Sequence, residues 1–594
     1  MKTGIKMLKK TITLIIAVLL TVTALAVGSY ALEENRDSYA NYVQGGQVSS
    51  VDDLIAAFTN KDTGKVYAIK DDTRPNTVIL NSDVKLRSSI VINDGVYTVL
   101  GSGCKIYRGS GFGALFVLNG SSTEVYPSLV LENLTLDGMN DKLNEADHGL
   151  VLAFGHSMLQ ATKVSFENSS SSGESGGAIC IKVNETSDYE KTPLYADLVI
   201  NECTFKSCSS ANGGAIASYA VGTVSGGNFV FEKCVFENNK ASSTGAYGYG
   251  GAISCMTGSF AFKNCTFKNN TADFGGAIYT MSGIKDTSST FEANSATLDG
   301  GAISGTGRVS LESTMIINNT AGKDGGAIAL NGDALTKNCY ISENSAGGNG
   351  GGMYILGTYE MSNGNLNLNT AKGIGGGIYV KGSNAQIKMT DGEIVGNKAE
   401  YCGGIYCVGE IRLIGGAIGN SVSEFPQVFV EGKISLGSKA MIKDDIVALS
   451  VKDKNAYPFV SVDTTLSDKY ILNLAYATPK TDENGEIISF KNVTRNGKCI
   501  IVADAKTMER INDAVKIKSR GLLSYKLDGE GVTSVRFVFL PIWAWIIILA
   551  VILGVCGFIF RKPIISLVTG KKQKKSKKVI KTKKKDLDSD SSIL

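Results

Sequence analysis

Apolar residues recur along this chain with a fixed period of 25 residues between Gly250 and Gly376. Each closes the phrase Gly-Gly-Ala-Ile or a close variant, and the residues at this position are Ile253, Ile278, Ile303, Ile328, Met353 and Ile378. Looser copies of the phrase end at Ile179, Ile216 and Ile405. A fixed period with variable ends predicts stacked units, because a unit this short cannot bury an apolar face alone.

A second ladder runs half a repeat out of phase, where an apolar residue is followed three positions later by asparagine. Its asparagines are Asn239, Asn270, Asn294, Asn319, Asn344, Asn369 and Asn397. Glycine, β-branched and aromatic residues fill the units, which favours short strands over helices. We therefore predict an all-β fold, a single-stranded parallel β-helix whose equivalent residues stack about 4.8 Å apart. Stacked carboxamides would bond to those above and below, since each holds a donor and an acceptor.

The repeats are flanked by less regular segments. Ser50 to Asp53, followed by Leu54, Ile55 and Phe58, predicts a capping box on a short amphipathic helix. Such a helix would cover the open end of the solenoid and its unpaired strand edges. The predicted organisation is an N-terminal cap with irregular first coils at 32–165, the regular repeats at 166–420, further coils at 421–504 and a membrane-proximal stalk or cap at 505–536.

The alternation of Gly-Gly-Ala-Ile with Phe-x-x-Asn resembles the repeat of the chlamydial polymorphic outer membrane proteins, from about Phe166 to Asn420. The region as a whole is similar to right-handed parallel β-helices of the pectin-lyase-like type, so the resemblance implies a right-handed solenoid. The chlamydial family carries an autotransporter barrel at its C-terminus, whereas this chain has a single apolar run there. The family's outer-membrane export route therefore does not carry over.

Both ends of the chain carry targeting signals. Four lysines precede an apolar stretch within residues 1–31, which predicts a secretory signal peptide. The apolar run Leu540–Phe560 predicts a transmembrane helix at 537–560, followed by a basic cytoplasmic tail at 561–594. The expected location is the cell membrane of a bacterium, single-pass type I, with the bulk outside and the tail along the inner leaflet. Binding of nucleic acid by this tail is the weaker alternative.

The cysteines are expected to be free. Eleven of the 12 lie outside the predicted membrane span, and an odd number argues against a complete disulfide framework. Four of them, Cys203, Cys234, Cys265 and Cys339, each precede a ladder residue by two positions and so share a strand face. We interpret them as a buried stack of thiols that fill space as small apolar side chains.

A polysaccharide lyase or glycoside hydrolase of the pectin-lyase-like fold is the alternative function. The weak catalytic candidates are Asp137, Asp147 and His148, in a segment that interrupts the early coils. Hydrolysis needs two carboxylates at a defined separation, but no recognisable polygalacturonase pattern is present. Asp299 and Asp324 precede glycine pairs and are interpreted as turn formers, because other units replace them. We expect no enzyme activity, no cofactor and no metal site.

The function we predict is that of an adhesin-like surface protein that binds extracellular glycans or the surface of a host or partner. The long lateral face of the solenoid carries tyrosines that follow inward-facing residues and so point outward. The tyrosines considered are Tyr247, Tyr249, Tyr279, Tyr354, Tyr379, Tyr401 and Tyr406. They suit sugar or protein contact, although strand propensity alone would also favour them.

Overall fold

The computed structural model describes residues 41–502 apart from 110–112, 121–125, 140–148, 173–175, 185–195, 222–225, 383, 420, 425, 444, 451–458, 463–471, 484–486 and 493–497, and also 515–517, 524–528, 532–538 and 551. The chain divides into two compact units, 1–519 with 526–536 and 520–525 with 537–594. The described residues lie almost entirely in the first unit. The predicted signal peptide and basic tail lie outside them.

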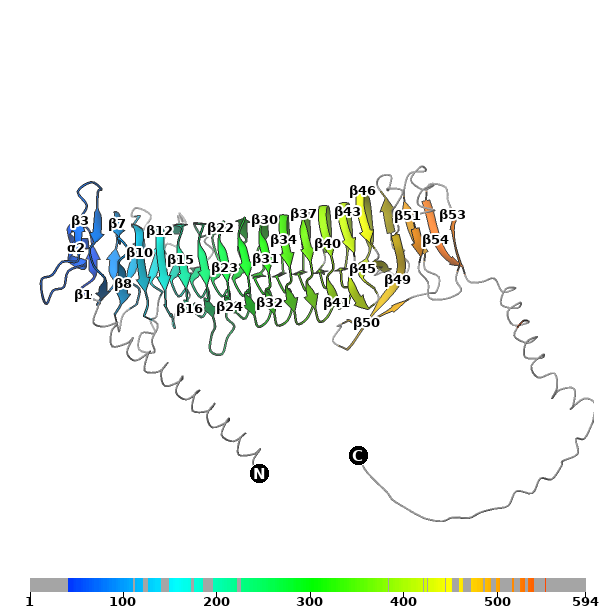
Figure 1. Cartoon of the computed structure of the whole chain (residues 1–594), viewed down its shortest axis with the longest axis horizontal. Coiled ribbons are helices and arrows are strands. Elements are labelled where there is room, and N and C mark those ends of the chain that lie inside the picture. The colour runs from blue at the N-terminus through cyan, green and yellow to red at the C-terminus, as the bar shows by residue number, and fades with distance from the viewer. Residues whose placement is uncertain are drawn as a thin grey trace, which may run out of the picture. The chain divides into compact units, whose positions relative to one another are not determined.

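The first unit is a solenoid whose coils contribute strands to three parallel sheets (Figure 1). The first sheet, after the N-terminal strands, begins with the long strands β10 (Ser128–Asp137) and β12 (Ser157–Glu167). It continues as two adjacent rows of short strands, β14 (Ala196–Asn201), β18 (Asn228–Glu232), β22 (Ser259–Lys263), β26 (Ile284–Thr287) and β30 (Val309–Glu312) in one row and β15 (Thr204–Lys206), β19 (Val235–Glu237), β23 (Thr266–Lys268), β27 (Thr290–Glu292) and β31 (Met315–Ile317) in the other. The rows merge into the long strands β34 (Ala334–Ser342), β37 (Thr358–Asn367), β40 (Gln386–Val395), β43 (Glu410–Gly419) and β46 (Lys433–Lys443).

The other two sheets consist of shorter strands. The second sheet contains β11 (Val151–Gly155), β13 (Ile179–Asn184), β17 (Ile216–Val221), β21 (Ile253–Cys255), β25 (Ile278–Thr280), β29 (Ile303–Gly305), β33 (Ile328–Leu330), β36 (Met353–Ile355), β39 (Ile378–Val380), β42 (Ile405–Cys407), β45 (Val428–Glu431) and β47 (Ile446–Ser450). The third contains β16 (Ser209–Ser210), β20 (Lys240–Ala241), β24 (Thr271–Ala272), β28 (Ser295–Ala296), β32 (Thr320–Ala321), β35 (Ser345–Ala346), β38 (Thr370–Ala371), β41 (Lys398–Tyr401) and β44 (Val422–Glu424).

Further strands extend the first two sheets toward both ends of the solenoid. The N-terminal strands are β1 (Asn41–Val43), β2 (Gly46–Val48), β3 (Ala68–Lys70), β4 (Thr77–Leu80), β5 (Val84–Leu86), β6 (Ile90–Ile92), β7 (Val96–Leu100), β8 (Lys105–Arg108) and β9 (Phe116–Gly120). The C-terminal strands are β48 (Phe459–Val462), β49 (Leu472–Thr481), β50 (Ile487–Asn492), β51 (Lys498–Val502), β52 (Val515–Ile517), β53 (Ser524–Asp528) and β54 (Val532–Val538). Of these, β49 and β50 pair antiparallel and form a hairpin that leaves the coil pattern.

The core is built from columns of identical or similar side chains. Ile253, Ile278, Ile303 and Ile328 pair in register through the second sheet and are fully buried. In the first sheet the rings of Phe166, Phe205, Phe236, Phe267 and Phe291 stack in one column, with neighbouring centroids 4.5–4.7 Å apart and planes within 4° of parallel. Each ring thus buries both faces against its neighbours, which a single coil cannot provide.

The glycine pairs meet two separate steric demands. The first glycine of a pair lies in the left-handed region, as at Gly300 with φ of +71°, where a side chain would be strained. The second allows close approach of the next coil, since a Cβ on Gly301 would lie 2.1 Å from the carbonyl oxygen of Gly326. A further left-handed corner in each coil precedes the ladder asparagine, and alanine and leucine occupy it at Ala293 and Leu368.

The seven ladder asparagines are buried and form one continuous chain of hydrogen bonds. In each step, Nδ2 of one carboxamide donates to Oδ1 of the next, for example from Asn294 to Asn319 and from Asn319 to Asn344, both at 3.0 Å. The main-chain N–H of Asn294 donates to the same Oδ1 of Asn319 at 2.9 Å. The chain begins where the N–H of Cys208 donates to Asn239. Along the chain every Oδ1 accepts from the preceding coil, and the Nδ2 groups of Asn239 to Asn369 each donate to the Oδ1 of the following asparagine.

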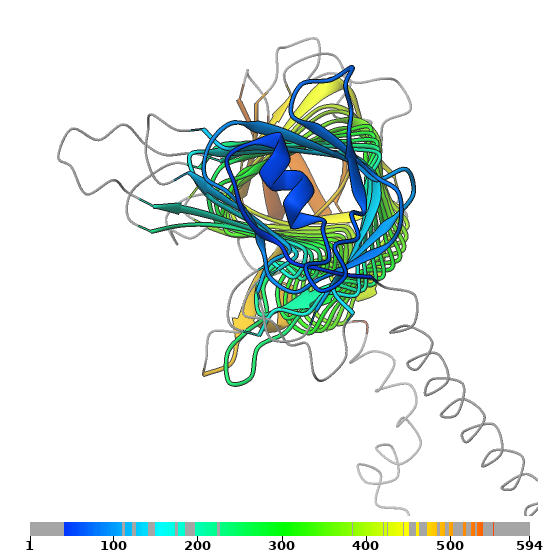
Figure 2. The same cartoon turned by 90° about the vertical axis from the view of Figure 1, so that its left-hand side faces the viewer.

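The helix α2 (Val51–Ala57) lies across the N-terminal end of the coils, as Figure 2 shows. Its N-cap is Ser50, whose side chain accepts from the N–H of Asp53, and the Asp53 carboxylate in turn accepts from the hydroxyl groups of Ser49 and Ser50. Leu54 and Phe58 are fully buried against the first coils. The helix therefore covers apolar side chains that the first coil would otherwise expose.

None of the ten cysteines whose side chains the structure describes forms a disulfide bond. Cys203, Cys234 and Cys265 are buried on successive coils, and Ser289 and Thr314 continue their column before Cys339. Burial raises the pKa of the Cys203 thiol to about 12, so this thiol is protonated and unreactive at neutral pH. The column acts as apolar packing.

The prediction of a C-terminal transmembrane helix is wrong for the part of the chain that the structure describes. There, α2 is the only helix of more than one residue, and no helix is both long and apolar enough to cross a bilayer. Of the predicted span Leu540–Phe560, only Val551 belongs to the described residues. The prediction relied on the length of an apolar run, which measures a preference for apolar surroundings and does not by itself establish a membrane span.

Candidate functional site

Two neighbouring columns of side chains on the surface of the second sheet frame the candidate site. The first, here called the turn column, has one residue per coil, four positions before the buried isoleucine or methionine: Tyr249, Phe274, Asp299, Asp324, Asn349, Ile374 and Tyr401. The second, the tyrosine column, follows the buried residue directly: Tyr279, Ser304, Ala329, Tyr354, Tyr379, Tyr406 and Phe429. Residue type varies along both columns, in contrast to the interior.

The tyrosine column is stacked over four coils. The ring centroids of Tyr354 and Tyr379 are 5.0 Å apart with planes 4° from parallel, and Tyr379 and Tyr406 follow at 4.6 Å and 14°. The stack becomes less accessible toward its C-terminal end, where Phe490 of the β49–β50 hairpin packs on Phe429 at 5.1 Å. Tyr354 remains half-buried, whereas Tyr406 is 4 % exposed. The open part of the stack is therefore at Tyr354.

The turn column is held by side-chain to main-chain hydrogen bonds between coils. Oδ1 of Asp324 accepts from the N–H of Asn349 at 2.7 Å, and Oδ1 of Asn349 accepts from the N–H of Ile374 at 3.0 Å. Asp299 accepts in the same way from Asp324. The carboxylates of Asp299 and Asp324 therefore link successive coils. Burial is the main cause that raises the pKa of the Asp324 carboxyl, with a smaller contribution from the charge of Asp299.

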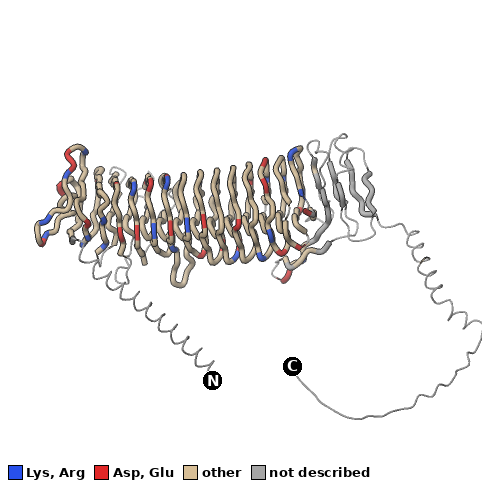
Figure 3. Tube along the Cα trace, in the orientation of Figure 1, with Lys and Arg blue, Asp and Glu red and all other residues tan. Residues whose placement is uncertain are grey.

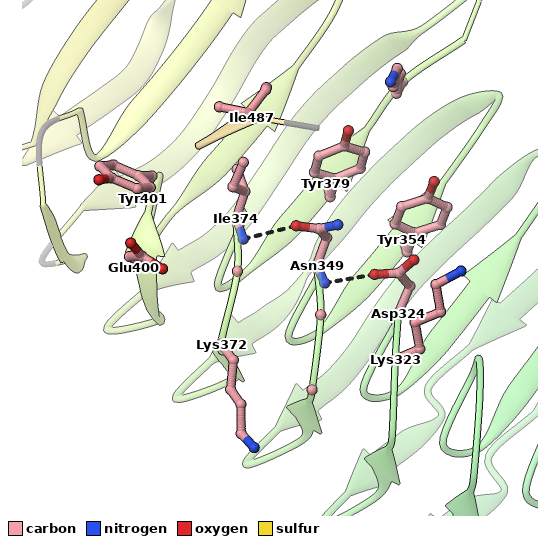
Figure 4. Close-up of a pocket in the computed structure, with 14 residues that line it drawn as sticks. Lys323, Asp324, Asn349, Tyr354, Lys372, Ile374, Tyr379, Glu400, Tyr401 and Ile487 are labelled. Atoms are coloured by element: carbon pink, nitrogen blue, oxygen red, sulfur yellow. Dashed lines mark hydrogen bonds between the residues drawn. The ribbon is translucent and has the colours of Figure 1, made fainter. Parts of the chain in front are cut away.

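A groove of about 760 Å³ lies between the two columns. Its side chains come from the turn column, the tyrosine column and the loops beside them: Lys323, Asp324, Asn349, Tyr354, Lys372, Ile374, Tyr379, Lys381, Glu400, Tyr401 and Ile487. Figure 4 shows Tyr354 and Tyr379 parallel, with their hydroxyl groups directed the same way, beside the row of Asp324, Asn349 and Ile374. The groove thus combines aromatic surface, an amide and charges of both signs.

The hydroxyl group of Tyr354 stays protonated at neutral pH. Burial raises its pKa to about 12, and the charges of Asp324 and Asp299 act in the same direction. A protonated phenol both donates and accepts hydrogen bonds. The groove therefore offers neutral hydrogen-bonding groups as well as lysine cations.

The predicted surface tyrosines fall into two groups. Tyr354, Tyr379 and Tyr401 line the groove, and Tyr406 lies beneath the hairpin. The remaining three lie at a different part of the solenoid, where Tyr247 and Tyr249 contact Phe274 and Tyr279 contacts Tyr249. Outward alternation was a sufficient signal for Tyr354 and Tyr379, whereas Tyr401 belongs to the turn column. It could not show that a distant hairpin covers Tyr406.

The groove residues that sequence reasoning missed are the lysines, Asn349, Ile374, Glu400 and Ile487. The register of the turn column, four residues before each buried isoleucine, was a signal for Asn349 and Ile374. Ile487 had no comparable signal, because the antiparallel β49–β50 hairpin brings it to the groove from outside the repeat.

The proposed catalytic residues do not contribute to this groove as far as they are described. Asp137 is 4 % exposed, and its Oδ1 accepts from the N–H of Met139 at 2.8 Å. Asp147 and His148 lie outside the described residues. Within the described coils, no group of three or more histidine, cysteine, aspartate or glutamate side chains is placed to hold a metal ion.

Comparison with known proteins gives one family match and a distant structural similarity. Residues 233–256, 264–281 and 288–306 match the Chlamydia polymorphic membrane protein repeat, which confirms the predicted repeat type in these stretches. No curated protein matches the chain. Among solved structures, tailspike protein 3 of bacteriophage CBA120 is similar at 14% sequence identity and a TM-score of 0.34. The similarity covers 69% of this chain and 64% of the tailspike chain.

Proposed function

We propose that this protein is an adhesin-like β-helix of the cell surface that binds an extracellular glycan in the groove beside Tyr354. The observation that carries the proposal is the accessible end of a tyrosine stack in a groove of about 760 Å³, next to an amide and charged side chains. Sugars offer apolar C–H faces and many hydroxyl groups. Aromatic rings with polar tips suit such ligands.

The surface location is supported by the repeat match. Polymorphic membrane proteins carry the matching repeat, and their name describes them as membrane proteins. Parallel coils also give a rigid lateral face, because each coil is fixed to its neighbours by main-chain hydrogen bonds throughout the repeats. A rigid groove loses little conformational freedom on binding, which favours affinity.

The test is retention of oligosaccharides by the full-length protein on a mixed glycan panel, compared with its Tyr354→Ala variant. We expect Tyr354→Ala to weaken binding about tenfold, which corresponds to about 1.4 kcal/mol of lost ring contact and hydrogen bonding. Tyr340→Ala is the matched control, because Tyr340 is a partly exposed tyrosine of β34 in the first sheet. Equal glycan binding by both variants and the unchanged protein would refute the site.

The same panel distinguishes binding from catalysis. Reducing ends and unsaturated products are measured with and without Ca²⁺ after incubation with the full-length protein. Retention without product supports the adhesin-like function. Product release that Tyr354→Ala abolishes would instead make the groove an active site of a polysaccharide-degrading enzyme.

A further inference from the structure

We infer that the groove selects anionic glycans, in which carboxylate or sulfate groups recur along a pyranose chain. The inference rests on the proposed glycan-binding function and adds the chemical class of the ligand. It starts from a contrast in how the lysines of the described coils are paired.

Most lysines of the first sheet pair with glutamates of neighbouring coils, Lys285 and Lys439 being exceptions. Figure 3 shows acidic and basic positions alternating along the coils. The nitrogen to oxygen distance is 3.0 Å for Lys263 and Glu232, and 2.7 Å for Lys337 and Glu312. Further pairs within 4.0 Å are Lys233 with Glu202, Lys268 with Glu292, Lys388 with Glu360 and Lys433 with Glu410. In-register stacking makes such pairing easy, because equivalent residues lie one strand spacing apart.

The three lysines of the groove depart from this rule. Lys323, Lys372 and Lys381 are exposed, and none has a carboxylate of the described residues within 4.0 Å. One unpaired surface lysine is common and is simply solvated. Three that line one groove with an aromatic wall form a set of cations that a ligand can neutralise.

Among the described residues, neither groove carboxylate forms an ion pair within 4.0 Å of these lysines, although the charge of Lys323 acts on Asp324 and lowers its pKa against the larger effect of burial. Oδ1 of Asp324 is bonded to the N–H of Asn349, and Figure 4 places Glu400 beside Tyr401, toward one end of the row. With three lysines against Asp324 and Glu400, the groove has a formal charge of +1. The raised pKa of Asp324, which burial causes, further reduces the negative charge at low pH.

The positions of the lysines favour a ligand with more than one acidic group. Lys323 and Lys372 belong to coils two steps apart, since Gly348 lies in the coil between them. At about 4.8 Å per strand spacing, their main chains are separated by about 10 Å along the solenoid. Lys381 follows Tyr379 by two residues on the same strand face. An extended chain along the groove would thus meet successive cations beside the tyrosine stack.

The experiment compares an acidic octasaccharide with its neutral counterpart and adds a sulfated one. The full-length protein is titrated with a hyaluronan octasaccharide, with the same octasaccharide after reduction of its carboxylates, and with a chondroitin sulfate octasaccharide as the sulfate arm. We expect at least tenfold tighter binding of one or both acidic ligands than of the neutral one. Raising the salt to about 0.5 M should remove most of this preference, because it screens exposed charges.

Two charge-matched double variants locate the effect. Lys323→Gln with Lys372→Gln should weaken binding of the acidic ligands about tenfold and weaken binding of the neutral ligand much less, so that the acidic preference is lost. The control variant, Lys337→Gln with Lys388→Gln, removes the same charge from paired lysines of the first sheet. It should leave the binding of acidic and of neutral ligands unchanged.

The outcomes separate the two proposals. Equal binding of acidic and neutral octasaccharides, both lost in Tyr354→Ala, would overturn the anionic preference and keep the glycan-binding function. An acidic preference that survives the groove double variant would overturn the assignment to these lysines. No retention of any glycan on the panel would overturn both.

Discussion

The asparagine ladder and the turn column each contribute one side chain per coil, but they differ in how far water can reach them and in how far the residue type varies. The ladder is inside, and its carboxamides are the same in seven successive coils because each needs the next as a partner. The turn column is at the surface, where water can replace a missing partner. It accordingly changes from tyrosine and phenylalanine through aspartate and asparagine to isoleucine. Uniform columns thus hold the solenoid together, and variable columns are where a binding site can develop.

The largest expected effect is a difference in the free energy of unfolding between two asparagine variants, one in the ladder and one in the turn column. Asn319→Ala should lower the free energy of unfolding by about 2–4 kcal/mol, because it removes the donor to Phe291 and Asn344 and leaves the buried main-chain N–H of Asn294 without its acceptor. Asn349→Ala should cost only about 1 kcal/mol, since its half-buried side chain accepts one hydrogen bond, from the N–H of Ile374, and is not a link in a chain of carboxamides. Thermal or chemical unfolding of both variants measures the difference. Losses of equal size would contradict the distinction between the columns.

The next effect is a pH-dependent change in stability that the buried carboxyl group of Asp286 causes. Asp286 is 3 % exposed in a column where its neighbours are Phe262 and Leu311, and burial raises its pKa. Its charged form is thus disfavoured in the folded state. The protein should therefore gain stability as the pH falls from neutral through this raised pKa toward the unfolded value of about 3.9.

Asp286→Asn tests this sign. The variant should be more stable than the unchanged protein at pH 7 and should lose part of the gain in stability on acidification, as followed by unfolding at several pH values. Asp333→Asn is the control with the opposite sign, because hydrogen bonds from Thr358 lower the pKa of Asp333. The Asp333 carboxylate therefore stabilises the folded protein at neutral pH, and this stabilisation is lost as the pH falls through the lowered pKa. The same pH profile for both variants would contradict the assignment.

The smallest expected effect on stability concerns the left-handed corner that precedes each ladder asparagine. The backbone conformation is the same in each coil, but the residue type varies. Leu368 occupies a left-handed corner with φ of +56° and is 55 % exposed, while Asn318 holds the equivalent corner two coils earlier. Asparagine tolerates this conformation better than leucine does. Leu368→Asn should therefore raise the stability by about 0.5–1 kcal/mol. A lower melting temperature would show that the leucine side chain contributes more than its backbone strain costs.

The repeat architecture could be predicted from the sequence because its signals are periodic. Spacing alone placed Ile303 on Ile328 and Asn294 on Asn319, and it identified the steric role of the glycine pairs. Ser50 and Asp53 marked the start of the capping helix. These features depend on neighbours at a fixed distance along the chain, which a single sequence displays directly.

The remaining features depend on contacts that have no fixed spacing. The hairpin of Ile487 and Phe490 packs on Phe429 and Tyr406, about 60 and 80 residues earlier in the chain, so alternation wrongly left Tyr406 at the surface. Asp286 stands at a position that the pattern reserves for apolar residues, and only Ser289 and Thr314 beside it explain how it is accommodated. The apolar run near the C-terminus was interpreted from its length alone, and this gave the incorrect membrane span.

The common orientation of the ladder carboxamides gives the solenoid an electrical polarity. Their seven dipoles add head to tail, as peptide dipoles do in a helix, with the negative end at Asn239 and the positive end at Asn397. Past the positive end, the next coils carry Ser421 and then the buried carboxyl of Asp445, which accepts from the N–H of Ser421 at 3.0 Å. One carboxamide turned the other way would set oxygen against oxygen at one junction and nitrogen against nitrogen at the other. Coils can therefore be added or lost in evolution only as units that preserve this direction.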